Sequence, residues 1–195
     1  MELILASNNT GKLQEMRTIL SVMGHEVRSQ REAGLELDVA ETGTTFSANA
    51  RLKAEAVVNV TGKAAIADDS GLVVAALGGA PGIYSARYGG DLCKSDEERY
   101  RYLLREMDGI EERDAHFVCS IVCLFPDGRE IEAEGCWRGK IRTAPQGDNG
   151  FGYDPVFYIP ELEKTAAELP SDVKNQISHR AKALQEFKAK LQMLL

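Results

Sequence analysis

Residues 3–12 read LILASNNTGK, a short apolar run followed by a polar loop that contains a glycine. Beyond this loop, apolar residues recur at the spacing of one helical face: Leu13, Met16, Ile19, Leu20 and Met23. Gly24 then provides a helix stop. The stretch predicts a strand, a loop and a helix, and this order begins an α/β fold with a partly parallel sheet.

The rest of the chain continues this alternation of strands and helices. Further strands are expected at His25–Arg28, Ala64–Ala67, His116–Phe125 and Arg129–Ile141. Further helices are expected from Phe46 to Val58, over Ser95–Met107 and over Ser178–Leu195. Pro126-Asp127-Gly128 joins the last two strands as a hairpin, so antiparallel strands extend the sheet. The chain shows no repeat and no linker, and residues 1–195 are expected to form one domain.

The charge balance limits the partners. The 195 residues include 23 Lys and Arg against 30 Asp and Glu, a formal net charge of −7, and the pI is about 5.1. This acidic balance argues against nucleic acid or an anionic membrane as a partner. If the protein binds a polyanion, it must do so with a few placed cations.

The amino terminus and the cysteines indicate a cytoplasmic protein. The apolar run after Met1 is too short for a signal peptide, and no stretch approaches the roughly 20 apolar residues that span a bilayer. The four cysteines form no C-x-x-C pair and have no histidine at zinc-ligand spacing: Cys93, Cys119, Cys123 and Cys136. We expect buried free thiols in a reducing compartment, with a disulfide or a catalytic thiol as the alternative.

The loop before the first helix has the features of a phosphate site. It consists of Ser7, Asn8, Asn9, Thr10, Gly11 and Lys12. A helix N-terminus offers unpaired N–H groups, glycine allows close backbone approach, and Lys12 adds a positive charge. It is not a Walker A loop, because Ala6 replaces the first glycine and Leu13 follows the lysine. A plain capped helix start is the alternative.

Two adjacent carboxylates, Asp68 and Asp69, precede Ser70 at the expected end of the Ala64–Ala67 strand. Beside a buried strand such groups are costly unless they are solvated, paired or bound to a cation. Mg²⁺ is commonly held by carboxylates and substrate phosphates, and a carboxylate beside it can take a proton from water. In an extended chain the two side chains would point to opposite faces. An acidic turn is the alternative.

Glu41, Asn49 and Lys53 form another candidate group around the start of the second helix. Asn49 and Lys53 are one helical turn apart at the margin of the apolar face, so both could reach into a cleft. The alternatives are a lysine that covers the edge of the core and a solvated glutamate.

An aromatic loop and the start of the last helix are candidates for binding a nucleobase. The loop reads Gly150-Phe151-Gly152-Tyr153-Asp154-Pro155, and an aromatic ring between glycines can stack on a base. An aromatic turn that fills the core is the alternative. Ser178-His179-Arg180 offers hydrogen-bond donors, although a lone histidine is usually structural. No G-x-S-x-G motif and no Cys–His pair indicates nucleophilic catalysis.

Six motifs, in this order, closely resemble the inosine/xanthosine triphosphate pyrophosphatase family. They are SNNTGK (7–12), ETGTTFSANARLKA (41–54), ADDSGL (67–72), GAPGIYSARY (79–88), FGYDP (151–155) and ISHR (177–180). The resemblance spans residues 3 to about 190. It implies an elongated two-lobed α/β fold with a mixed sheet, an active-site cleft between the lobes, and a homodimer.

The resemblance also implies an activity, the hydrolysis of ITP, dITP, XTP and dXTP to the monophosphate and pyrophosphate, which cleanses the nucleotide pool. Ser7–Lys12 and Lys53 are similar to its triphosphate-binding residues, and Glu41 and Asp69 to its Mg²⁺ ligands. Asp69 also resembles the proton acceptor, with Asp68 as its assistant. The implied substrate and base contacts are Ser70, Phe151, Gly152, Tyr153, Asp154, Lys174, His179 and Arg180. The segment Tyr84–Tyr88 is expected to shape the cleft or the dimer surface.

One loop departs from the family pattern, and two other functions compete with this one. The loop before Phe151 is often rich in Gly and Thr in the family, whereas here it reads Gly147-Asp148-Asn149-Gly150. The added carboxylate bears on purine selectivity and not on the reaction class. The competing functions are a nucleotide sensor without hydrolysis, which would not need Asp69 as a base, and a pyrophosphatase for other modified nucleotides.

Overall fold

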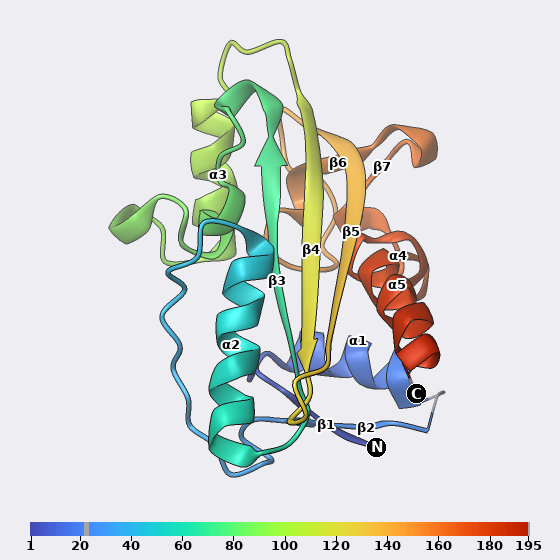
Figure 1. Ribbon diagram of the computed structural model, residues 1–195. Helices are drawn as coiled ribbons and strands as arrows, with labels where there is room; N and C mark the ends of the chain where they lie inside the picture. Colours follow the sequence, from blue (N-terminus) through green and yellow to red (C-terminus); the bar gives the residue numbers. More distant parts are fainter. Residues whose placement is uncertain (22–23, 195) are drawn as a thin grey trace. The chain divides into compact units, whose positions relative to one another are not determined.

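A computed structural model describes residues 1–21 and 24–194 of the chain (Figure 1). The strands are β1 Glu2–Leu5, β2 Glu26–Ser29, β3 Ala65–Val74, β4 Asp114–Leu124, β5 Glu130–Ile141, β6 Phe157–Ile159 and β7 Lys164–Thr165. The helices are α1 Thr10–Leu20, α2 Phe46–Thr61, α3 Asp96–Glu106, α4 Ser171–Ile177 and α5 His179–Leu194. Met23 and Leu195, which were expected in helices, lie outside the described residues.

The strands form one mixed sheet in the order β2-β1-β3-β4-β5-β6-β7. β1 pairs in parallel with β2 and β3, whereas β6 pairs antiparallel with β5 and β7. The predicted α/β class with a partly parallel sheet is therefore confirmed. Within the described part of the chain, no helix is long and apolar enough to cross a membrane.

The described residues divide into two compact units, which we treat separately. The first contains Met1–Asp69, Cys119–Gly135 and Lys182–Leu195, and the second contains Ser70–Val118 and Cys136–Ala181. The boundary passes between Asp69 and Ser70, two consecutive residues of β3.

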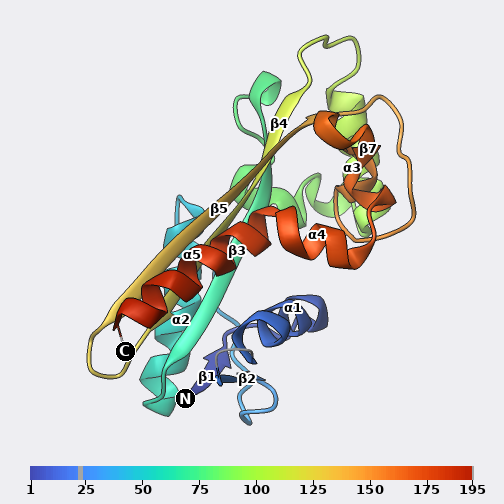
Figure 2. The ribbon, with the colours of Figure 1, turned by 90° about the vertical axis from the view of Figure 1, so that its right-hand side faces the viewer.

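The first unit is a sheet with helices on both faces. In β1, Leu3 and Leu5 face the cluster that contains α1 and α5 residues, while Ile4 faces the cluster that contains α2 residues. Figures 1 and 2 show the same arrangement, with α2 on one side of this part of the sheet and α1 and α5 on the other. α2 follows the N-cap Thr45, whose hydroxyl accepts from Ala48 N, and precedes the C-cap Gly62, whose φ of +63° favours glycine.

The second unit has its own core. This core lies between the parts of β3, β4 and β5 that belong to this unit, the strand β6 and the helix α3. Its buried members include Leu72, Leu103, Met107, Phe117, Trp137, Tyr153 and Phe157. α3 starts after Ser95, which forms a capping box with Glu98, so the charged helix expected over Ser95–Met107 is confirmed.

Three expectations need correction. β3 does not end at Ala67 but continues to Val74, so Asp68, Asp69 and Ser70 lie inside a strand and the acidic-turn alternative is wrong. The helix expected from Ser178 is preceded by α4, and Ser178 separates α4 from α5. β6 and β7 were missed because strands of 3 and 2 residues are too short to show a periodic pattern.

The four cysteines, all within the described residues, are not joined by disulfides. Cys93, Cys119 and Cys123 are buried as expected, whereas Cys136 is only partly buried.

Candidate active site

The loop between β1 and α1 uses its own polar groups to start the helix. Asn9 Oδ1 accepts from Lys12 N at 3.1 Å, and Ser7 Oγ accepts from Asn9 N at 3.1 Å. Asn8 Oδ1 accepts from Arg31 N at 3.2 Å, which fixes the loop to the segment after β2. The capped helix start is therefore present, with Thr10 and Gly11 in the first turn of α1. Phosphate binding by this loop stays a prediction.

Asp68 and Asp69 point to opposite faces of β3 because the strand is extended through them. Asp68 has the same parity as Ile66, which packs in the cluster with α1, and its Oδ2 lies 3.0 Å from Lys12 Nζ. Asp69 has the same parity as Ala67, which packs in the cluster with α2. Each strand carboxylate therefore contacts a lysine from a different helix.

The side chains around Asp69 come from α2 and the segment before it. Lys53 Nζ lies 3.0 Å from Glu41 Oε1 and 3.1 Å from Asp69 Oδ1, so one ammonium group joins two carboxylates. Asn49 donates from Nδ2 to Asp69 Oδ2 at 3.4 Å. The same side chain accepts from Gly43 N at 2.8 Å, where a β-carbon on Gly43 would come within 2.7 Å of Asn49 Oδ1.

The sequence places Asn49 beside Lys53 as a side chain that could reach into a cleft, but it predicts no role for this amide. Its side chain is fully buried and contacts both Gly43 and Asp69. The signal for it was its position one helical turn before Lys53, on the same face of α2.

Burial and charge together set the protonation of this group. Burial raises the pKa of Asp69, and the Lys53 ammonium opposes that rise. For Lys53, burial favours the neutral form, but Asp69, Asp68 and Glu41 outweigh it and raise its pKa, so the amine stays charged. When all are ionised, the carboxylates of Glu41, Asp68 and Asp69 exceed the ammonium groups of Lys12 and Lys53 by one negative charge.

In the second unit, side chains from the aromatic loop, α4 and α5 come together. Asp154 Oδ2 accepts from Phe151 N at 2.9 Å and lies 2.5 Å from Lys174 Nζ. The ring of Phe151 has Lys174 Nζ at 4.7 Å and Arg180 Cζ at 5.9 Å from its centroid. Arg180 Nη2 also lies 3.4 Å from Ser70 Oγ. The structure thus brings five of the predicted base-side residues into one group.

The two aromatic residues of this loop lie in different surroundings. Phe151 is 48% exposed, so the alternative that it fills the core is wrong, whereas Tyr153 is 5% exposed and belongs to the core of the second unit. Gly150 is required by the turn, because its φ is +78° and a β-carbon would lie 2.1 Å from Asp154 Oδ2.

His179 is buried and its ring stacks on Phe117, with centroids 4.8 Å apart and an interplanar angle of 16°. The ring centroid of Trp137 lies 6.5 Å from that of His179. The structural reading of this histidine is therefore supported by its packing, and its contact with a base stays a prediction.

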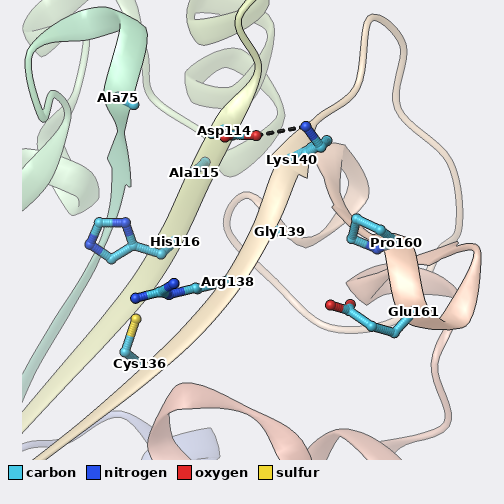
Figure 3. A pocket seen from close by; sticks show the side chains of 10 residues that line it. All are labelled: Ala75, Asp114, Ala115, His116, Cys136, Arg138, Gly139, Lys140, Pro160 and Glu161. Atoms are coloured by element: carbon cyan, nitrogen blue, oxygen red, sulfur yellow. Dashed lines mark hydrogen bonds and ion pairs between the residues drawn. The ribbon is translucent and has the colours of Figure 1, made fainter.

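A separate hollow of about 410 Å³ lies on the second unit, between β4, β5 and the segment after β6 (Figure 3). Its wall includes His116, Cys136 and Arg138, together with Lys140, whose Nζ lies 2.7 Å from Asp114 Oδ1. None of the predicted site residues lines this hollow, and it is not part of the candidate site.

The fold defines an α/β protein with a mixed sheet. Its first unit holds carboxylates paired with lysines, and its second unit holds an aromatic loop beside Lys174 and Arg180. A model of the Ham1 family matches residues 3–190, and the chain belongs to the Ham1 family.

Named relatives and a solved structure are similar to this chain over nearly its whole length. The chain is 50% identical over 185 residues to the dITP/XTP pyrophosphatase of Geobacillus kaustophilus, which covers 94% of this chain and 90% of that protein. It is 46% identical over 188 residues to the dITP/XTP pyrophosphatase of Bacillus subtilis, covering 95% and 94%. The solved structure of the Staphylococcus aureus Ham1 protein matches with a TM-score of 0.92 at 44% identity, covering 100% of both chains. The predicted family and α/β fold are confirmed.

Proposed function

We propose that this protein hydrolyses non-canonical purine nucleoside triphosphates, namely ITP, dITP, XTP and dXTP, to the monophosphate and pyrophosphate. The observation that carries the proposal is the buried carboxylate of Asp69, held 3.1 Å from Lys53 Nζ and 3.4 Å from Asn49 Nδ2. Relatives that carry the name dITP/XTP pyrophosphatase at 45–50% identity support the same reaction. Residues 1–195 would form one catalytic domain.

Mg²⁺ fits the donor set of this group. Glu41 Oε1 and Asp69 Oδ1 both lie within 3.1 Å of Lys53 Nζ, so their oxygens already converge on one positive charge. No group of three or more His, Cys, Asp and Glu side chains gathers as a metal site within 1–21 and 24–194. Two carboxylates completed by substrate phosphates and water are a usual Mg²⁺ environment. When bound there, the ion would neutralise charge on the phosphate oxygens.

The chain's own residues would divide the phosphate chemistry among them. Asp69 accepts a proton from the attacking water as the water oxygen bonds to the α-phosphorus. The bond from the α-phosphorus to the bridging oxygen breaks, and pyrophosphate leaves. Lys53 and the loop Ser7–Lys12 bind the triphosphate oxygens, and Asp68 assists from the other face of β3, where it orients Lys12.

The group in the second unit would bind the nucleoside. Phe151 stacks on the base, with Gly152, Tyr153 and Asp154 forming the loop and Ser70 contacting the substrate. Lys174 and Arg180 carry only hydrogen-bond donors, and together with His179 they favour a 6-oxo group. A 6-amino group would place donors against donors, which costs buried hydrogen bonds and disfavours ATP.

Pyrophosphate release from ITP with Mg²⁺ tests the reaction. Asp69→Asn keeps the shape of the side chain but removes the base, and turnover should fall by about 10² to 10⁴-fold while IMP still binds. Asp127→Asn, in the β4–β5 turn, is the matched control and should turn over like the wild type. Release of single phosphate, or equal rates in the wild type and Asp69→Asn, would contradict the proposal.

The substrate panel and the assembly have their own measurements. Turnover of dITP, XTP, dUTP and methylated triphosphates separates a purine house-cleaning enzyme from one for other modified nucleotides. Binding of ITP without turnover would indicate a sensor. A homodimer in the cytoplasm is part of the proposal, and light scattering of the purified chain tests the dimer.

A further inference from the structure

The 3₁₀ helix Gly82–Arg87 lies in the GAPGIYSARY motif, and Ser85 within it is 7% exposed. Its hydroxyl donates to Gly82 O at 2.7 Å and accepts from Leu72 N at 2.8 Å. Leu72 lies two residues after Ser70 in β3. The side chain of Ser85 therefore fixes this short helix to the part of β3 that follows Ser70.

The backbone of the same residue holds the aromatic loop. Tyr153, 5% exposed, donates from its hydroxyl to Ser85 O at 2.7 Å. Tyr153 directly precedes Asp154, the carboxylate that accepts from Phe151 N and contacts Lys174. On the other side of Tyr153, Gly152 N donates to Asp96 Oδ2 at 2.8 Å. Two bonds from distant segments thus hold the centre of the loop.

The loop needs such support because it cannot hold Phe151 by packing alone. Phe151 is half exposed, and the glycines on both sides of it have positive φ values of +78° and +62°. A side chain that is ordered before binding loses less conformational entropy when a ligand arrives.

We propose that Ser85 is a positioning residue for the nucleobase: it connects β3 beside Ser70 to Tyr153 and thereby fixes Phe151 and Asp154. This inference rests on the proposed function for the identity of the base. It assigns a role to the Tyr84–Tyr88 segment that involves no direct contact with the ligand.

The test compares binding of the two products by calorimetry, because IMP contains the base and pyrophosphate does not. Tyr153→Phe removes only the bond to Ser85 O, and Ser85→Ala removes the hydroxyl that holds Leu72 N. Each should raise the dissociation constant of IMP about three- to tenfold, the range expected for the one bond lost in Tyr153→Phe and for the loss of the bond from Leu72 N in Ser85→Ala. The dissociation constant of pyrophosphate should stay within twofold. In the double variant, the dissociation constant of IMP should rise by less than the product of the two single effects, because both changes break the same connection between β3 and the aromatic loop.

Two matched variants separate positioning from general loss of stability. Ser120→Ala removes a buried serine hydroxyl from the first unit, and Tyr158→Phe removes a tyrosine hydroxyl elsewhere in the second unit. Both should bind IMP like the wild type. Three results would each overturn the inference. They are equally weakened binding of IMP and pyrophosphate in Tyr153→Phe, unchanged IMP binding in this variant, and a wild type that does not bind IMP. A wild type that binds IMP but releases no pyrophosphate from ITP would contradict only the proposed reaction. If Ser85→Ala does not fold, Tyr153→Phe alone decides.

Discussion

Gly150 and Gly152 flank Phe151, and replacing each with alanine separates backbone strain from a side-chain collision. Both have positive φ values, +78° and +62°. A β-carbon at Gly150 would lie 2.1 Å from Asp154 Oδ2, whereas one at Gly152 would have nothing within 4 Å. The two variants therefore share the unfavourable backbone conformation, and only Gly150→Ala displaces the Asp154 carboxylate.

The difference between them can be estimated from the contacts of Asp154. A left-handed backbone conformation costs a non-glycine residue about 1–2 kcal/mol, which applies to both variants. Moving Asp154 also weakens its bonds from Phe151 N at 2.9 Å and Lys174 Nζ at 2.5 Å. A hydrogen bond to a charged group contributes about 1.5–3 kcal/mol. Gly152→Ala should lower the free energy of unfolding by about 1–2 kcal/mol, and Gly150→Ala by about 3–5 kcal/mol.

Urea denaturation followed by circular dichroism measures both losses, provided that the slope with denaturant stays constant. Calorimetric binding of IMP gives the second readout, and Gly150→Ala should weaken it by about tenfold more than Gly152→Ala does. Equal losses of stability in the two variants would refute the reasoning, because Asp154 would then not organise the loop.

Two further predictions concern buried groups of the first unit. Lys12→Met removes the ammonium 3.0 Å from Asp68 Oδ2, a carboxylate with a fully buried side chain, and should lower the free energy of unfolding by about 3 kcal/mol. Adding Asp68→Asn should restore most of this loss in urea denaturation, and a single variant as stable as the wild type would contradict the contact. Iodoacetamide at pH 8 should modify Cys136 well before Cys123. Burial raises the pKa of Cys123 to about 12, so almost none of this thiol is ionised at pH 8. Mass spectrometry measures both rates, and equal rates would show that Cys123 is accessible.

Much of the fold could be predicted because most elements carry their own periodic pattern. The first strand, loop and helix followed directly from residues 3–24, and the helix α3 from the charged stretch Ser95–Met107. The resemblance implies two lobes, but the boundaries of the two units could not be predicted from the residues, because β3, β4 and β5 each continue across a boundary.

The candidate site was predicted mainly from the order of the motifs along the chain, and the structure adds which of its side chains contact one another. Glu41, Lys53 and Asp69 are separated in sequence but joined by contacts of 3.0 and 3.1 Å. The end of β3 was misplaced because aspartate is uncommon in strands. Here each aspartate contacts a lysine from a flanking helix, which allows the strand to continue. No role could be predicted for Asn49, because an uncharged amide shows its role only through its partners.

The alternation of Asp68 and Asp69 along β3 makes the site sensitive to the length of the chain. Ala65 and Ile66 are held in register by β1, at Ile4 and Leu5. Deleting Ala67 would therefore turn Asp68 toward α2 and Asp69 toward α1, although neither aspartate had been replaced. Lys53 and Lys12 would each contact the other's carboxylate, and the residues that follow in the strand would also change faces. A substitution in β3 alters one side chain, whereas a one-residue deletion exchanges the two sides of the strand at once.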